Sequence, residues 1–293
     1  MILLPVGQVG LKVRRTPWAT CALLASCLLG FLLSGQANLV PRADLARYQR
    51  ATAALEFQRQ RPELALGEPF ERVFGVRGAA ERDAVSSARQ TELDRLVAAA
   101  LEAHRAHPLS RWGVDPARPA PTRLVTYMFL HAGWLHLLSN LLLLYLAGPF
   151  IEDAWGRLPF LGLYFAAGIV AALVHVGANA GSPLPLVGAS GAIAGVMGAF
   201  LVRYARVRIR FVYMIGVFMR GSFQAPAWLM LVLWFLSQLA LAALQPERGV
   251  AHSAHVGGFV IGVSLATLVV LLNLEPRRDG ATARDGSAPA GSS

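Results

Sequence analysis

The sequence has little charge, little cysteine and no acidic residue in the interior of its long apolar runs. Charged residues make up 15% of the 293 residues and hydrophobic residues 55%, whereas soluble domains carry about 25% charged residues. The two cysteines, Cys21 and Cys27, both lie in the first apolar run, and no C-x-x-C or H-E-x-x-H spacing occurs. The sequence therefore predicts a membrane protein with no metal site and no cofactor.

The basic net charge of +10 does not indicate a nucleic-acid partner. About half of the basic residues lie between Arg42 and Arg123, where acidic residues nearly cancel them. Most of the others flank apolar runs, where they set the orientation of membrane helices. Because no basic stripe is interleaved with aromatic residues, we expect the lipid bilayer rather than nucleic acid to be the partner of this chain.

Six apolar runs are each read as a membrane-spanning helix, which predicts an all-α polytopic membrane protein. They cover residues 18–33, 128–151, 158–178, 186–204, 227–244 and 254–272. A cleaved signal peptide is the alternative for the first run, but a retained helix is favoured. Basic residues gather at the ends that would share a side with the N-terminus, so both termini are expected in the cytoplasm.

The runs divide the chain into four regions. Residues 1–36 form a cytoplasmic N-terminus and the first span, and residues 122–274 hold the other five spans. Between them, 37–121 is expected to be an extracytoplasmic helical insertion, with helices over about 42–60 and 82–104. This insertion is expected to be a helical hairpin that packs outside the membrane, or alternatively a module that gates substrates or mediates self-association. Residues 275–293 are rich in glycine, alanine and serine and are expected to be a disordered cytoplasmic tail.

One hydroxyl group, that of Ser190, lies in a glycine-rich apolar stretch, and His255 lies in another. Each glycine weakens a helix interior by roughly 1 kcal/mol relative to alanine, but in a membrane small residues allow two helices to approach closely. Both serine and histidine are expected in the first turns of helices that enter from the outside. The glycines expected to pack the helices at this site are Gly188, Gly191, Gly258 and Gly262.

These residues carry the parts that acyl transfer requires. A serine nucleophile needs a base within hydrogen-bond reach, and the intermediate needs donors that face its oxyanion. His136 and Asn140 lie one helical turn apart on one face and are candidate donors, together with the backbone N–H of Ser190. No carboxylate could complete a triad, so a Ser190–His255 dyad is implied. His252, one turn before His255, is the rival base.

Four local patterns in this order resemble the rhomboid intramembrane serine proteases. They are FLHAGWLHLLSN at 129–140, GPFIEDAWG at 148–156, GASG at 188–191 and AHVGGFVIG at 254–262. The resemblance implies a six-helix bundle in the bacterial inner membrane, with 122–274 as the catalytic core around a water-filled cavity. It implies Ser190 as nucleophile, His255 as base, and His136 and Asn140 as oxyanion stabilisers.

The substrates implied by the resemblance are single-span membrane proteins, cleaved in or near their transmembrane segments. One alternative is a catalytically silent relative that binds membrane clients, although such relatives typically lose the serine or the histidine. A small transporter is disfavoured because no paired acidic or basic residue marks an ion path and no inverted repeat is visible.

Overall fold

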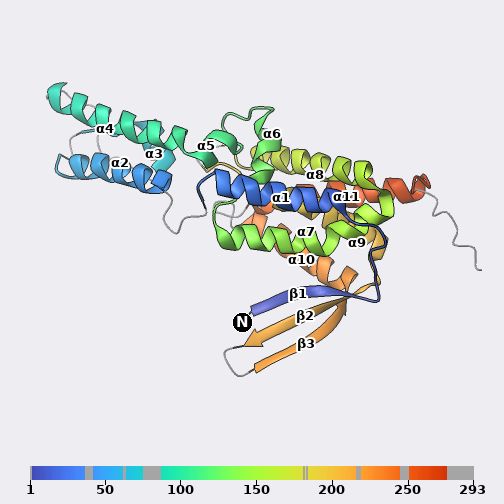
Figure 1. The fold of residues 1–293 in the computed structure, drawn as a ribbon. Helices are drawn as coiled ribbons and strands as arrows, with labels where there is room; N and C mark the ends of the chain where they lie inside the picture. The colour runs from blue at the N-terminus through green and yellow to red at the C-terminus, as the bar shows by residue number, and fades with distance from the viewer. Residues whose placement is uncertain are drawn as a thin grey trace, which may run out of the picture.

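The computed structural model describes residues 2–36, 42–61, 64–74, 87–180, 182, 184–215, 219–244 and 251–275. Most of these residues are helical, and six apolar helices lie side by side as a bundle (Figure 1). The helices of the bundle are α1 (Trp18–Leu33), α7 (Trp134–Trp155), α8 (Arg157–Ala178), α9 (Ser190–Tyr204), α10 (Ala227–Leu244) and α11 (His252–Leu271).

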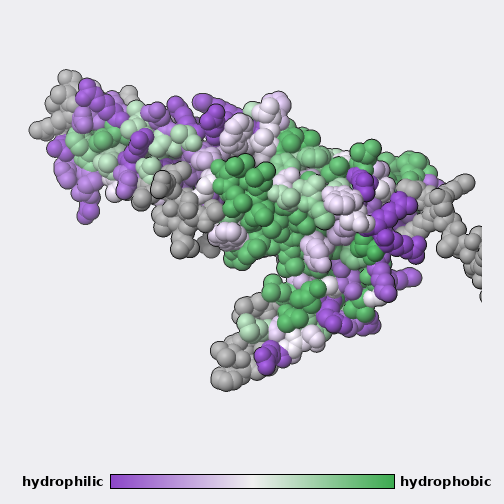
Figure 2. All heavy atoms as spheres, viewed as in Figure 1, coloured by the Kyte–Doolittle hydropathy of each residue, from purple (hydrophilic) through white to green (hydrophobic). Residues whose placement is uncertain are grey.

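Four of these helices, α7, α8, α10 and α11, are long and apolar enough to cross a membrane. The other two, α1 and α9, have 16 and 15 residues, which at 1.5 Å per residue is shorter than a hydrocarbon core of about 30 Å. On the face of the bundle seen in Figure 2, apolar side chains cover the surface, and polar residues gather towards the two ends. This distribution is that of an integral membrane protein.

The helix α9 occupies the centre of the bundle, because every residue from Gly191 to Phe200 is buried. Its closest neighbour is α11, and the two backbones touch through glycines. A Cβ added at Gly258 would overlap the carbonyl of Gly191, and one added at Gly262 would overlap the carbonyl of Gly195. Small residues thus allow a close helix contact that larger side chains would prevent.

Two acidic residues in the last turn of α7 bind the N-terminal end of α1. Glu152 is buried, and its carboxylate accepts hydrogen bonds from the backbone N–H groups of Ala19 and Thr20 at 2.9 and 2.8 Å. The Thr20 hydroxyl donates a third bond at 2.8 Å. Asp153 accepts from the backbone N–H of Arg15 at 3.0 Å. A carboxylate at this position satisfies unpaired N–H groups and interacts favourably with the helix dipole.

Replacing Glu152 with alanine should therefore destabilise the protein more than replacing Asp153 with alanine. Loss of the buried carboxylate leaves the α1 donors unpaired, which should lower the free energy of unfolding by about 1–3 kcal/mol. Asp153 is less buried, so its loss should cost less. Thermal unfolding of both variants in detergent provides the comparison, and equal losses would contradict a capping role for Glu152.

The expectation of an all-α chain is wrong at the N-terminus and between α9 and α10. The strands β1 (Ile2–Val9), β2 (Arg208–Ile215) and β3 (Met219–Pro226) form an antiparallel sheet in the order β1-β2-β3. The sheet lies beside the bundle, near the end where α1 begins (Figure 1). Ile209, Phe211 and Ala225 are buried, and the Gln8 side chain donates to the backbone carbonyl of Leu146.

A second helical unit lies beyond the opposite end of the bundle (Figure 1). It contains α2 (Arg42–Arg59), α3 (Glu68–Phe74) and α4 (Ser87–Ala106), which share a small core of their own around Phe70 and Leu93. Helices α2 and α4 run antiparallel, because Asp44 pairs with His107 just beyond α4 and Arg50 reaches the carbonyl of Ala99. Residues 75–86, which include the predicted start of the second helix, lie outside the described residues.

Three short helices, α5 (Pro108–Trp112), α6 (Arg123–Thr126) and η1 (Tyr127–Phe129), join this unit to the bundle. The chain beyond Glu275, where the sequence predicts a disordered tail, also lies outside the described residues, as do residues 245–250.

Candidate active site

Ser190 is the first residue of α9, and the loop before it is held in place by the chain at Gly113 and Val114. The backbone groups of Val114 and Leu186 exchange hydrogen bonds of 3.0 and 2.8 Å. Gly113 lies so close to this loop that a Cβ there would contact the carbonyl of Leu186 at 2.9 Å. The segment between α5 and α6 therefore supports the loop that carries the serine.

Gly188 lies in this loop and not within a helix, contrary to the predicted helical run at 186–204. Its φ of +116° is a conformation that residues with a Cβ rarely adopt. A Cβ at this position would also lie 2.6 Å from Nε2 of His136. Gly188 thus gives the loop its shape and leaves room for the His136 ring, whereas Gly191, Gly258 and Gly262 lie at contacts between helices.

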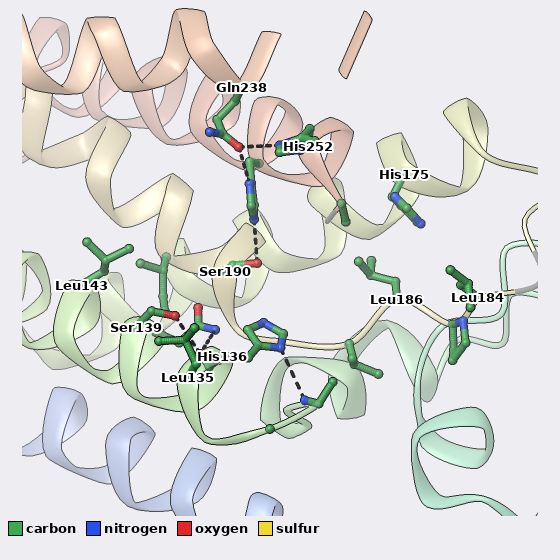
Figure 3. Close-up of a pocket in the computed structure, with 18 of the residues that line it drawn as sticks. Leu135, His136, Ser139, Leu143, His175, Leu184, Leu186, Ser190, Gln238 and His252 are labelled. Carbon is green, nitrogen blue, oxygen red and sulfur yellow. Dashed lines mark hydrogen bonds between the residues drawn. The ribbon is translucent and has the colours of Figure 1, made fainter. Parts of the chain in front are cut away.

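The structure brings Ser190 and His255 into direct contact. His255 lies in the first turn of α11, and its Nε2 is 2.8 Å from Oγ of Ser190 (Figure 3). This is the nucleophile–base distance that acyl transfer requires. The glycine contacts between α9 and α11 bring the two helices close enough for it.

The rival base, His252, does not bind Ser190. Its Nδ1 is 2.9 Å from Oε1 of Gln238, and the same oxygen lies 2.7 Å from Nδ1 of His255. Gln238 is not among the residues that the sequence pattern singles out. The available signal is that Gln238 and Ser237 are polar residues within the apolar run 227–244, where polar side chains are functional candidates.

His136 and Asn140 lie in the first two turns of α7, next to the serine loop. The Asn140 side chain donates to the backbone carbonyl of His136 at 2.9 Å, which leaves a second amide hydrogen. The backbone N–H of Ala132 points at Nδ1 of His136, at 3.4 Å. A neutral ring that accepts there carries its proton on Nε2, the nitrogen that faces Gly188.

The predicted site residues Ser190, His255, His136 and Asn140 all line one cavity of about 810 Å³. This volume is within the size range of small-ligand sites. Figure 3 shows Ser190, His136 and Gln238 around it. No aspartate or glutamate is among its lining residues in the described part of the chain. Its larger apolar lining residues are Trp134, Leu135, Leu143, Leu184, Leu186, Ile193, Met197 and Trp234.

A second serine–histidine contact joins α8 to α11. His175 Nδ1 is 3.1 Å from Oγ of Ser253, and the Asn179 side chain also donates to that oxygen at 3.1 Å. His175 is buried. Ser253 is not among the residues that line the cavity, so it provides a control for experiments on Ser190.

An integral membrane protein with a serine–histidine contact facing a cavity is the class that this fold and site define. A family model for the Rhomboid domain matches residues 118–272, more than half of the chain. The chain therefore belongs to the rhomboid family. The match begins just after Gly113 and ends just beyond α11, so it includes Ser190 and His255.

Several curated proteins are similar over this region. Rhomboid-like protease 5 of Toxoplasma gondii is 32% identical over 146 residues, which cover 48% of this chain and 15% of that protein. Rhomboid protease GluP of Bacillus subtilis is 40% identical over 94 residues, covering 32% and 18%. Human Rhomboid-related protein 3 is 30% identical over 163 residues, covering 53% and 38%. The matches thus span well under half the length of these three relatives.

Proposed function

We propose that this protein is an intramembrane serine endopeptidase that uses Ser190 and His255 as a catalytic dyad. The observation that carries the proposal is the 2.8 Å contact between Nε2 of His255 and Oγ of Ser190, at a cavity in the membrane bundle. Relatives named as rhomboid proteases support the same reaction class.

In the proposed reaction, Nε2 of His255 takes the proton from the Ser190 hydroxyl while Oγ attacks the carbonyl carbon of a peptide bond. The oxyanion that forms is stabilised by His136, Asn140 and the backbone N–H of Ser190. His255 then gives its proton to the leaving amine as the C–N bond breaks, which leaves an acyl ester on Ser190. A water molecule, deprotonated by the same histidine, hydrolyses that ester.

The proposed substrates are single-span membrane proteins that are cut in or near their transmembrane segment. A peptide bond in a helix is shielded by the helix's own hydrogen bonds, so a client segment must unwind to reach Ser190. Within this proposal, residues 122–274 form the catalytic core, six helices cross the membrane, and the cavity opens on the outer side. Both termini then lie in the cytoplasm of a bacterial cell, and α2–α4 lie outside, where they could mediate self-association.

Labelling with a fluorophosphonate probe tests the proposal, because such probes react with activated serines. The wild-type protein, purified in detergent, should be labelled, and Ser190→Ala should lose the label. Ser253→Ala is the matched control and should keep it, although Ser253 also contacts a histidine. Label that persists in Ser190→Ala would contradict the assigned nucleophile. A folded wild type that takes no label would favour the client-binding alternative.

A further inference from the structure

We propose that Gln238 is a positioning residue that holds the His255 ring in the tautomer able to accept the Ser190 proton. The inference rests on the proposed function and concerns how the base of that site is prepared. Gln238 comes from α10, whose buried residues are Ala227, Leu231 and Gln238. Gln238 is the one polar side chain of these three, and its Oε1 lies 2.7 Å from Nδ1 of His255, on the side of the ring away from Ser190.

The orientation of the Gln238 amide follows from its neighbour Ser237. The Ser237 hydroxyl donates its single hydrogen to the backbone carbonyl of Trp234 at 2.6 Å. Its oxygen can then only accept from Gln238, which lies 3.3 Å away. The Gln238 atom on that side must be the NH₂ group, so the amide oxygen faces the two histidines.

The amide oxygen in turn determines where the histidine protons lie. An amide oxygen carries no hydrogen, so the Nδ1 atoms of His252 and His255 must both donate to it. Its two lone pairs accommodate both bonds. With its proton on Nδ1, the neutral His255 ring presents an unprotonated Nε2 to the Ser190 hydroxyl, which is the tautomer that a general base needs.

The same bond should strengthen as the reaction proceeds. When His255 accepts the Ser190 proton, the ring becomes positively charged, and hydrogen bonds from a charged donor are roughly twice as strong as neutral ones. In a Ser-His-Asp triad, a carboxylate orients the histidine and stabilises its charged form. No acidic residue lines the cavity in the described part of the chain. The Gln238 oxygen therefore occupies the position at Nδ1 of His255 that the carboxylate occupies in a triad.

The test compares two substitutions of similar size at position 238. Gln238→Met removes the hydrogen-bond acceptor, whereas Gln238→Glu retains one. The rate constant of inactivation, kinact, and the binding constant, KI, are measured for a fluorophosphonate probe on the full-length protein in detergent. Gln238→Met should lower kinact by about 10- to 100-fold, the range for loss of one hydrogen bond to a charged group, with KI unchanged. Gln238→Glu should remain within about threefold of the wild type, because it keeps the acceptor.

Three outcomes would overturn the inference. A kinact for Gln238→Met equal to that of the wild type would show that the acceptor is not needed. In that case, labelling of the wild-type protein would still support the proposed function. Equal losses in both variants would assign Gln238 a merely structural role. A wild type that takes no label would remove the proposed function and this inference together.

A second measurement does not depend on whether the two variants at position 238 fold. Spectra of ¹⁵N-histidine-labelled wild type, compared with those of His255→Ala, identify the resonances of the His255 ring in the neutral form. A proton on Nδ1 supports the inference, and a proton on Nε2 would overturn it.

Discussion

Replacing His255 with alanine should slow fluorophosphonate labelling of Ser190 by about 10²- to 10⁴-fold, the usual contribution of a general base. Without Nε2 at 2.8 Å, the Ser190 hydroxyl has no acceptor for its proton and remains a weak nucleophile. The rate of probe incorporation, measured at several probe concentrations on detergent-purified protein, gives the effect directly.

The informative comparison for this prediction is His252→Ala. His252 lies one turn from His255 and shares the Gln238 acceptor, but it makes no hydrogen bond to Ser190 in the described part of the chain. Its removal should therefore slow labelling much less than removal of His255. A larger effect from His252→Ala would assign the role of base to His252 instead.

A leucine at Gly262 should reduce labelling by more than about 100-fold even though Gly262 touches neither the serine nor the histidine. Any side chain at this position overlaps the backbone of Gly195, so α9 and α11 must separate. A misplacement of about 1 Å can cost a factor of about 100 in rate. Gly258→Leu should act in the same way, through the backbone of Gly191.

Gly162 offers a matched control on α8, because nothing lies within 4 Å of a Cβ added there. Gly162→Leu should label at the wild-type rate. The amount of each variant that is inserted in the membrane and remains monodisperse in detergent is measured alongside. Full labelling by inserted Gly262→Leu would show that the glycine contact does not determine the serine–histidine distance.

Local patterns predict the bundle and the residues that meet at its cavity. Apolar runs of helical length and glycines at helical spacing are formed by residues that are close together in the sequence. These patterns therefore suffice to predict that Ser190 and His255 lie at a similar depth in the bundle. Gly188 shows where this reasoning weakens. An apolar residue run does not reveal that the helix begins at Ser190, because the boundary depends on the bond between Val114 and Leu186.

The sheet and Gln238 could not be predicted because their partners are distant in sequence. The strand β1 pairs with β2 about 200 residues later, and nothing within residues 2–9 indicates that partner. Gln238 is a visible polar residue in the apolar run at 227–244, but the role of Gln238 depends on how α10 is rotated against α11. Side-chain periodicity in a helix that is apolar on nearly all faces does not specify that rotation.

Two contacts at the N-terminus impose a counting rule on the membrane crossings. Arg15, which precedes α1, binds Asp153 at the end of α7, so an even number of crossings must separate them. In the proposed six-span arrangement α7 crosses the membrane, as its length allows, and this contact then requires α1 to cross as well. The pairing of β1 with β2 likewise requires an even number of crossings among α1, α7, α8 and α9. Within the proposed arrangement α9 is therefore a crossing despite its 15 residues. The physical consequence of that proposed arrangement is a bilayer thinned locally around these two short helices.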